Sequence, residues 1–244
     1  MADSRQTAHQ SMGGEFEREL MDVFAHDLRA GMVPIKTYAQ MLGTGIMGDV
    51  SPQQKEALEA IDRCVQKQVD RVTAVLDIIK SQEGRLELQM EWGNLADLLQ
   101  SAVSPLTVEA KRRSVVLNLD LDTAPAVARI DPPRIRRILA GLVSRALRRA
   151  QANDTVSVEL RYPQPQRARV RIWDTSKGPP DADVAFLHKS CRDQAVEHKR
   201  GMPLPNLELG STADILRAHR ASIEVQLAPA GSSVYILEFL AERR

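Results

Sequence analysis

Aromatic residues and cysteines are scarce in this sequence of 244 residues. Phe, Trp and Tyr together make up 4% of the chain, and the two cysteines, Cys64 and Cys191, lie far apart. Few aromatics argue against a stacking surface for single-stranded nucleic acid. The cysteines match no metal-ligand spacing and indicate a reducing compartment rather than a disulfide scaffold. We therefore expect a cytoplasmic protein with no nucleic-acid partner and no metal site.

A net charge of one sign and long hydrophobic runs are also lacking. Thirty-three basic residues against 32 acidic ones leave a formal net charge of +1, which gives no overall attraction to nucleic acid or to a membrane. No apolar run approaches the roughly 20 residues that span a bilayer, and the polar N-terminus lacks a signal-peptide pattern. No membrane partner is predicted. With 43% hydrophobic residues, the chain can form a core in one or two domains.

Two long helices are predicted in the first third of the chain. Residues 1–14 are polar and aperiodic, so we expect a disordered tail. From Glu15, apolar residues recur at helical spacing as far as the glycines that follow Leu42, with Pro34 as a candidate bend. Ser51 and Pro52 form an N-cap and a first helical position. The second helix carries a heptad: Leu58, Ile61, Val65, Gln68, Val72, Val75 and Ile79.

The heptad predicts a homodimer. A single hairpin over residues 15–87 cannot bury such a stripe, whereas two chains can bury it by pairing into a four-helix bundle. Residues 88–244 instead alternate helices with mostly antiparallel strands, which indicates an α/β sandwich. The predicted fold class is therefore α+β.

His26, in the stretch FAHDLRA, is the strongest candidate for chemistry. The apolar centre of the first helix lies about 130° away from it, so the imidazole should face solvent. A neutral imidazole can attack a phosphoryl group, and the adjacent Asp27 can orient the ring or accept its proton. An exposed histidine beside an aspartate is more often a solvated surface, so this pattern alone leaves both interpretations open.

The hairpin and its surroundings resemble the core of bacterial sensor histidine kinases. The family motif of His, Glu or Asp, Leu and Arg corresponds to His26, Asp27, Leu28 and Arg29, and the region from Leu95 onward looks like the ATP-binding domain. The resemblance implies that His26 is the phosphoacceptor, with roles for Asp27 and Arg29. It also implies a response-regulator receiver domain as the partner, and a separate histidine kinase as a second one.

The sequence departs from this family at residues that would act on phosphate and metal. Ala30 replaces the Thr or Asn that positions water for dephosphorylation, so phosphatase action by the usual route is not expected. Gly141 and Arg145 replace the two asparagines of the helix that binds Mg²⁺ and phosphates. Arg145 cannot ligate a cation. It either contacts phosphate directly, as a vestigial site, or is an exposed helical arginine.

The two glycine boxes of the family are altered unequally. The first keeps Asp174, which would accept the adenine amino group, and Gly178, but has Ser176 in place of a glycine. Asp174 equally fits a strand-end residue that caps a turn. The second box reads Asn-Leu-Glu-Leu over 206–209, where Glu208 brings negative charge near the expected phosphates. Residues 179–205 match the family's ATP lid in length.

Three functions remain open from the sequence. In the first, His26 receives a phosphoryl group and passes it to a response-regulator aspartate, while the ATPase-like domain is degenerate. In the second, the chain is a divergent autokinase that uses ATP and Mg²⁺ held around Asp174. In the third, it is a pseudokinase scaffold that dimerises and modulates a kinase or regulator. No input domain is seen before Glu15, so a signal would come through a partner or through a longer protein.

Overall fold

The chain divides into two compact units, Met1–Lys80 and Ser81–Arg244. The computed structural model describes residues 3–122, 126–177, 212–227 and 232–243. Among these residues, no helix is long and apolar enough to cross a membrane.

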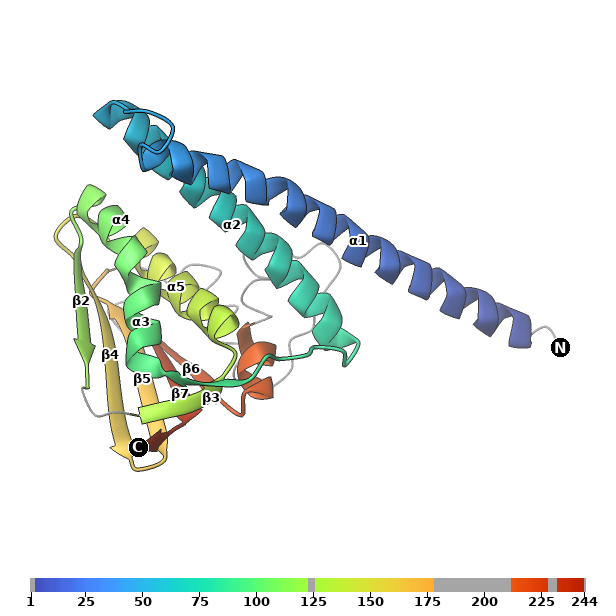
Figure 1. The fold of residues 1–244 in the computed structure, drawn as a ribbon. Helices are drawn as coiled ribbons and strands as arrows, with labels where there is room; N and C mark the ends of the chain where they lie inside the picture. Colours follow the sequence, from blue (N-terminus) through green and yellow to red (C-terminus); the bar gives the residue numbers. More distant parts are fainter. Residues whose placement is uncertain (1–2, 123–125, 178–211, 228–231, 244) are drawn as a thin grey trace. The chain divides into compact units, whose positions relative to one another are not determined.

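The first unit is a hairpin of two long helices, α1 (Asp3–Gly43) and α2 (Pro52–Gln82) (Figure 1). Ser51 Oγ accepts from the Gln54 N–H at 3.2 Å, while Gln54 Oε1 accepts from the Ser51 N–H at 2.7 Å. This reciprocal capping box fixes the start of α2 where the sequence predicts it. In the connecting loop, Gly45 and Gly48 have φ angles of 77° and 116°, which residues with a Cβ rarely adopt.

Helix α1 extends further toward the N-terminus than the sequence pattern indicates. Helix α1 begins at Asp3 rather than at Glu15, so residues 3–14 are helical. The segment 3–12 contains neither proline nor glycine, and extending an existing helix costs far less free energy than nucleating a new one.

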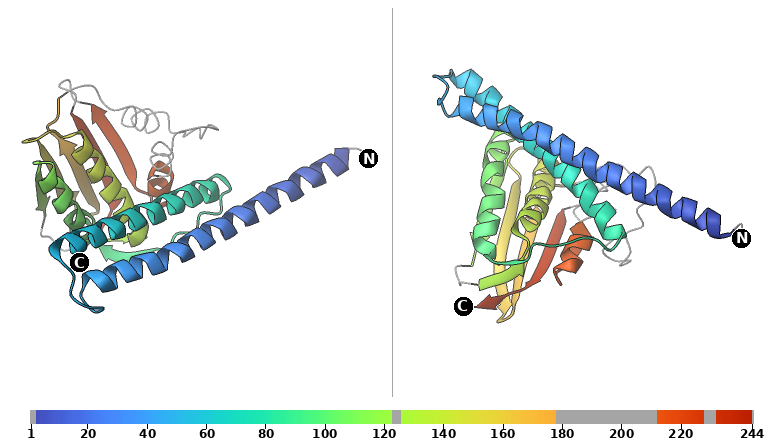
Figure 2. Two further views of the ribbon diagram at one scale, coloured as in Figure 1. Left: turned by 90° about the horizontal axis from the view of Figure 1, so that it is seen from above. Right: turned by 45° about the vertical axis from the view of Figure 1, so that its right-hand side comes forward.

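Polar pairs between the two helices keep a single antiparallel register. They are Asp22 Oδ1 with Lys80 Nζ at 3.4 Å, Lys36 Nζ with Gln66 Oε1 at 2.5 Å, and Gln40 Nε2 with Asp62 Oδ1 at 2.8 Å. Pro34 lies inside α1 between the first and second pairs. It leaves the Ala30 carbonyl without a helical donor, yet the register is the same on both sides of it. Because α2 ends at Gln82, this register leaves the first part of α1 beyond α2, as both views in Figure 2 show.

Helix α1 carries a row of apolar residues that is largely exposed in one copy of the chain considered alone. Its members recur at alternating steps of four and three: Phe24, Leu28, Gly31, Ile35, Tyr38 and Leu42. Phe24, Ile35 and Tyr38 are 56%, 51% and 58% exposed. The heptad of α2 is covered only in part, since Val65 is buried while Ile61 is 43% exposed. Such a continuous apolar stripe is unusual on a free monomer.

The second unit contains a five-stranded sheet, in the order β2-β4-β5-β7-β6, and a three-stranded sheet, in the order β1-β3-β8. The strands are β1 Glu91–Asn94, β2 Val116–Leu121, β3 Ala126–Ile130, β4 Thr155–Gln164, β5 Arg167–Asp174, β6 Ser222–Leu227, β7 Ser233–Leu240 and β8 Glu242–Arg243. The pairing of β2 with β4 is parallel and the other described pairings are antiparallel. The predicted mostly antiparallel sheet is confirmed, whereas the sequence pattern does not predict β1, β3 or β8.

Helices lie against one face of the larger sheet (Figure 1). They are α3 Leu95–Val103, η1 Ser104–Leu106, α4 Thr107–Arg112, α5 Pro132–Arg149 and a short helix over 212–218. Every second side chain of β5 and β7 is buried, and Leu139 and Leu142 of α5 belong to the same core. The amphipathic pattern of residues 95–113 predicts one helix, but this helix is interrupted at Ser104-Pro105, where proline lacks the N–H that continues an α-helix.

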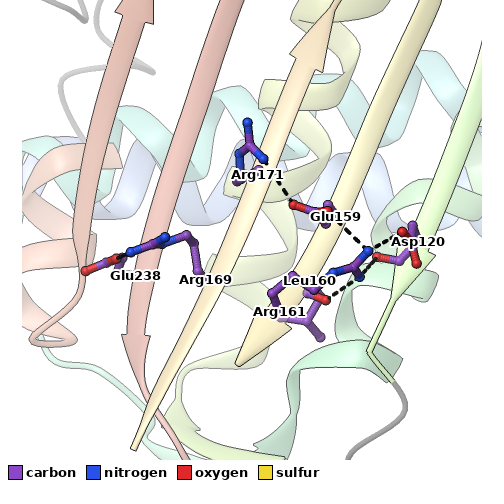
Figure 3. A network of polar contacts seen from close by, with 7 residues as sticks. All are labelled: Asp120, Glu159, Leu160, Arg161, Arg169, Arg171 and Glu238. Atoms are coloured by element: carbon purple, nitrogen blue, oxygen red, sulfur yellow. Dashed lines mark hydrogen bonds and ion pairs between the residues drawn. The ribbon is translucent and has the colours of Figure 1, made fainter. Parts of the chain in front are cut away.

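The opposite face of the larger sheet is charged (Figure 3). Three of its ion pairs join neighbouring strands: Arg161 with Asp120, Arg171 with Glu159, and Arg169 with Glu238. Arg161 also pairs with Glu159 of its own strand, β4. The hydrogen bond from Arg161 lowers the pKa of Asp120, and the hydrogen bond from Arg169 lowers that of Glu238. Exposed pairs of this kind each contribute about 0–1 kcal/mol, so their main effect is to keep this face polar.

Asp131 joins three segments of the second unit. An aspartate followed by two prolines is a sequence signal for an N-cap, and Asp131 caps α5, with Oδ1 accepting from the Arg134 N–H at 3.2 Å. Its Oδ2 accepts from the Gln89 N–H at 3.0 Å, and its own N–H donates to His219 Nε2 at 2.9 Å. His219 Nδ1 lies 2.6 Å from the Ile215 carbonyl, which fixes the neutral tautomer with the proton on Nδ1.

We expect the free energy of unfolding to fall as the pH drops below about 6.5. Burial lowers the pKa of His219, outweighing the opposing effects of the Ile215 carbonyl and Asp131, so the unfolded chain binds more protons in this window. Burial raises the pKa of Asp131, but hydrogen bonds from Arg134 and Gln89 outweigh it and the net pKa is lowered. The Asp131 contribution is therefore lost at still lower pH. Because a single histidine titrates in this range, the free energy of unfolding can change by at most about 1.4 kcal/mol per pH unit.

Urea unfolding at about pH 7.5 and about pH 5.5 measures this effect. In a His219→Gln variant, the amide can accept from the Asp131 N–H and donate to the Ile215 carbonyl without titrating. That variant should lose less stability over the same interval. An unchanged slope in the variant would assign the pH dependence to other groups.

Candidate functional site

His26 lies on the solvent-facing side of α1. Its side chain is 78% exposed, that of Asp27 is 75% exposed, and Nδ1 of His26 lies 3.5 Å from Oδ1 of Asp27. The predicted orientation toward solvent is confirmed. A carboxylate near Nδ1 favours the tautomer that carries its proton there, which leaves the lone pair on Nε2.

The residues that follow His26 are arranged less directly for chemistry. Arg29 Nε donates to the Ala25 carbonyl at 3.2 Å, so the guanidinium folds back along its own helix. A catalytic role for Arg29 stays a prediction. Ala30 is exposed and has no side-chain group that can hold a water molecule.

Asp174, the last residue of β5, has a fully buried side chain. Its Oδ1 accepts hydrogen bonds from the Ser176 N–H at 3.0 Å and from the Ser176 hydroxyl, which agrees with the turn-capping interpretation. Its Oδ2 has no hydrogen bond and faces Arg149 Nε at 3.8 Å. The sequence pattern does not predict this ion pair.

Arg145 is buried rather than exposed, with only 6% of its surface accessible, which corrects the interpretation as an exposed helical arginine. The physical reason is periodicity. Starting from the buried Ile138 and Leu142, steps of three and four lead to Arg145 and Arg149, so the buried stripe of α5 ends in two arginines. Contact of Arg145 with phosphate stays a prediction.

The described residues do not fit the ATP and Mg²⁺ that the resemblance implies. A guanidinium at Arg145 offers no lone pair to a cation, and within the described ranges no group of three or more His, Cys, Asp or Glu side chains could hold a metal ion. The Asp174 carboxylate already contacts Ser176 and Arg149. Gly178, the second glycine box at 206–209 and the expected lid at 179–205 lie outside the described residues.

Comparison with known proteins identifies the second unit. Residues 130–243 match the family described as histidine kinase-, DNA gyrase B- and HSP90-like ATPase. The circadian input-output histidine kinase CikA of Synechococcus elongatus is 24% identical over 210 residues, which cover 85% of this chain and 28% of CikA. The sensor protein KdpD of Escherichia coli is 23% identical over 235 residues, which cover 96% of this chain and 25% of KdpD.

The fold agrees with these sequence matches. The crystal structure of full-length ShkA in complex with AMPPNP superposes with a TM-score of 0.61 at 14% identity, and the match covers 93% of this chain and 46% of ShkA. The chain spans about a quarter of the length of CikA and KdpD. Residues 130–243 therefore match an ATPase domain of the histidine kinase, DNA gyrase B and HSP90 type, and the chain is similar over most of its length to histidine kinases such as CikA.

Proposed function

We propose that the chain is a phosphotransfer protein in which His26 carries a phosphoryl group that it exchanges with an aspartate of a receiver domain. The observation that carries this proposal is the exposed imidazole of His26 with a carboxylate beside Nδ1. Nε2 of the neutral ring attacks the phosphorus of the aspartyl phosphate, the N–P bond forms, and the P–O bond to the receiver carboxylate breaks. The ring then carries a positive charge that Asp27 stabilises.

The protein acts as a homodimer in this proposal. The exposed row of α1, with Ile35 and Tyr38 half exposed or more, supports pairing of two hairpins into a four-helix bundle. His26 lies about 180° around α1 from Ile35, so burying this row against a second copy leaves the imidazole accessible. A receiver domain can therefore approach the outer face of the bundle.

The identity of the phosphoryl donor tests the proposal. The chain is incubated either with a ³²P-phosphorylated receiver domain or with [γ-³²P]ATP and Mg²⁺, and label that is acid-labile and alkali-stable is counted. We expect label from the receiver domain and none from ATP. Label from ATP would support the autokinase instead, and no label from either donor would support the scaffold.

A further inference from the structure

We propose that Arg149 and Ser176 prevent Asp174 from binding an adenine base, so that the ATPase-type domain adopts its fold without nucleotide. The inference goes beyond the proposed function, because it concerns the second unit and does not depend on His26. It identifies Arg149 as the residue that prevents the adenine contact at this position.

The first carboxylate oxygen is already satisfied. Oδ1 of Asp174 has two lone pairs, and the N–H and the hydroxyl of Ser176 both donate to it. Ser176 is 3% exposed, so both donors are held inside the protein. A glycine at this position would supply only the N–H, and the serine hydroxyl therefore takes the second acceptor site.

The second oxygen faces a positive charge. Oδ2 of Asp174 lies 3.8 Å from Arg149 Nε, and the two side chains are 0% and 4% exposed. An adenine amino group is a neutral donor, whereas the guanidinium carries a full positive charge that attracts the carboxylate electrostatically, most strongly where water is excluded. A base that approached Oδ2 would have to displace the guanidinium and leave it buried without this carboxylate, which is strongly unfavourable.

The positive charge beside Asp174 lies inside the protein. The side chains of Arg145 and Arg149, one turn apart on α5, are both buried. The guanidinium of Arg149 therefore occupies the space beside this carboxylate.

Adenosine binding tests the inference, because adenosine carries the base without phosphates. Ligand-observed NMR should detect no binding of adenosine to the full chain at up to about 1 mM. An Arg149→Ala/Ser176→Gly variant should bind adenosine at least about tenfold more tightly than the unaltered chain, because the guanidinium that competes for Asp174 has been removed. Adding Asp174→Asn should remove the gain. Arg148→Ala is the matched control, since Arg148 is the exposed neighbour on α5, and it should gain nothing.

Two binding results would overturn the inference: adenosine binding by the unaltered chain that Asp174→Asn abolishes, or no gain in the folded double variant. Since adenosine has no phosphoryl group, neither result bears on phosphotransfer at His26.

A thermal measurement keeps the inference testable if the double variant does not fold. Removing one member of a buried ion pair should lower the Tm by on the order of 10 °C, for Asp174→Asn and for Arg149→Met alike. The combined change should lower it by less than the two shifts added together. If Asp174→Asn leaves the Tm within about 2 °C of the unaltered chain, the ion pair does not close this position and the inference is wrong.

Discussion

Replacing His26 with alanine is expected to abolish phosphoryl transfer from a phosphorylated receiver domain, lowering the incorporated label by at least about 100-fold. The reason is chemical, because alanine has no atom that can form the bond to phosphorus. The fold should be unaffected, since the His26 side chain is 78% exposed and its ion pair with Asp27 is on the surface. Phosphorimaging after acid and alkali treatment measures the label, and circular dichroism verifies that the variant is folded.

Two matched variants separate the role of His26 from that of its neighbours. His9→Ala alters the other histidine of α1 and should leave the label unchanged. Asp27→Asn keeps the size of the side chain but removes the charge beside Nδ1, and it should slow transfer by between about 10- and 100-fold. Acid-labile label that persists in His26→Ala would place the phosphoryl group on another residue and refute the proposed function.

The sequence predicts those elements whose signals are local. Ser51 and Asp131 mark the starts of α2 and α5 because each cap depends on residues three positions away. The exposure of His26 follows from helical periodicity alone. Proline at position 105 is also a local signal, and it explains the interruption after α3 once the structure of the helix is known.

Features that depend on distant partners could not be predicted in the same way. Arg145 and Arg149 are charged residues that are usually exposed, and the buried side chain of Arg149 faces Asp174 at the end of β5, 25 residues further along the chain. The short strands β3 and β8 hold each other through two residue pairs more than 100 positions apart. The signal for Arg149 is visible only in retrospect, as the continuation of the buried stripe of α5 into two arginines.

Ile35→Glu is expected to dissociate the proposed dimer into folded monomers. Ile35 is 51% exposed in the single chain, so the substitution should cost the isolated hairpin little. In a symmetric interface both copies contribute the same patch, and two unpaired carboxylates would be buried together. We expect the dimer dissociation constant to rise at least about 100-fold, or about 2.7 kcal/mol. Sedimentation velocity over a range of concentrations measures it.

Thr37→Glu is the matched control for Ile35→Glu, because it places the same charge on α1 about 160° away from Ile35. That control should remain dimeric, and a dimer that survives Ile35→Glu unchanged would show that the exposed row is not the interface. The monomeric variant also separates assembly from chemistry. His26 and Asp27 lie on one helix and form their ion pair within one chain, so a single hairpin contains the whole nucleophile. Ile35→Glu should therefore retain phosphoryl transfer within about tenfold, whereas a complete loss would mean that the second copy contributes to the site.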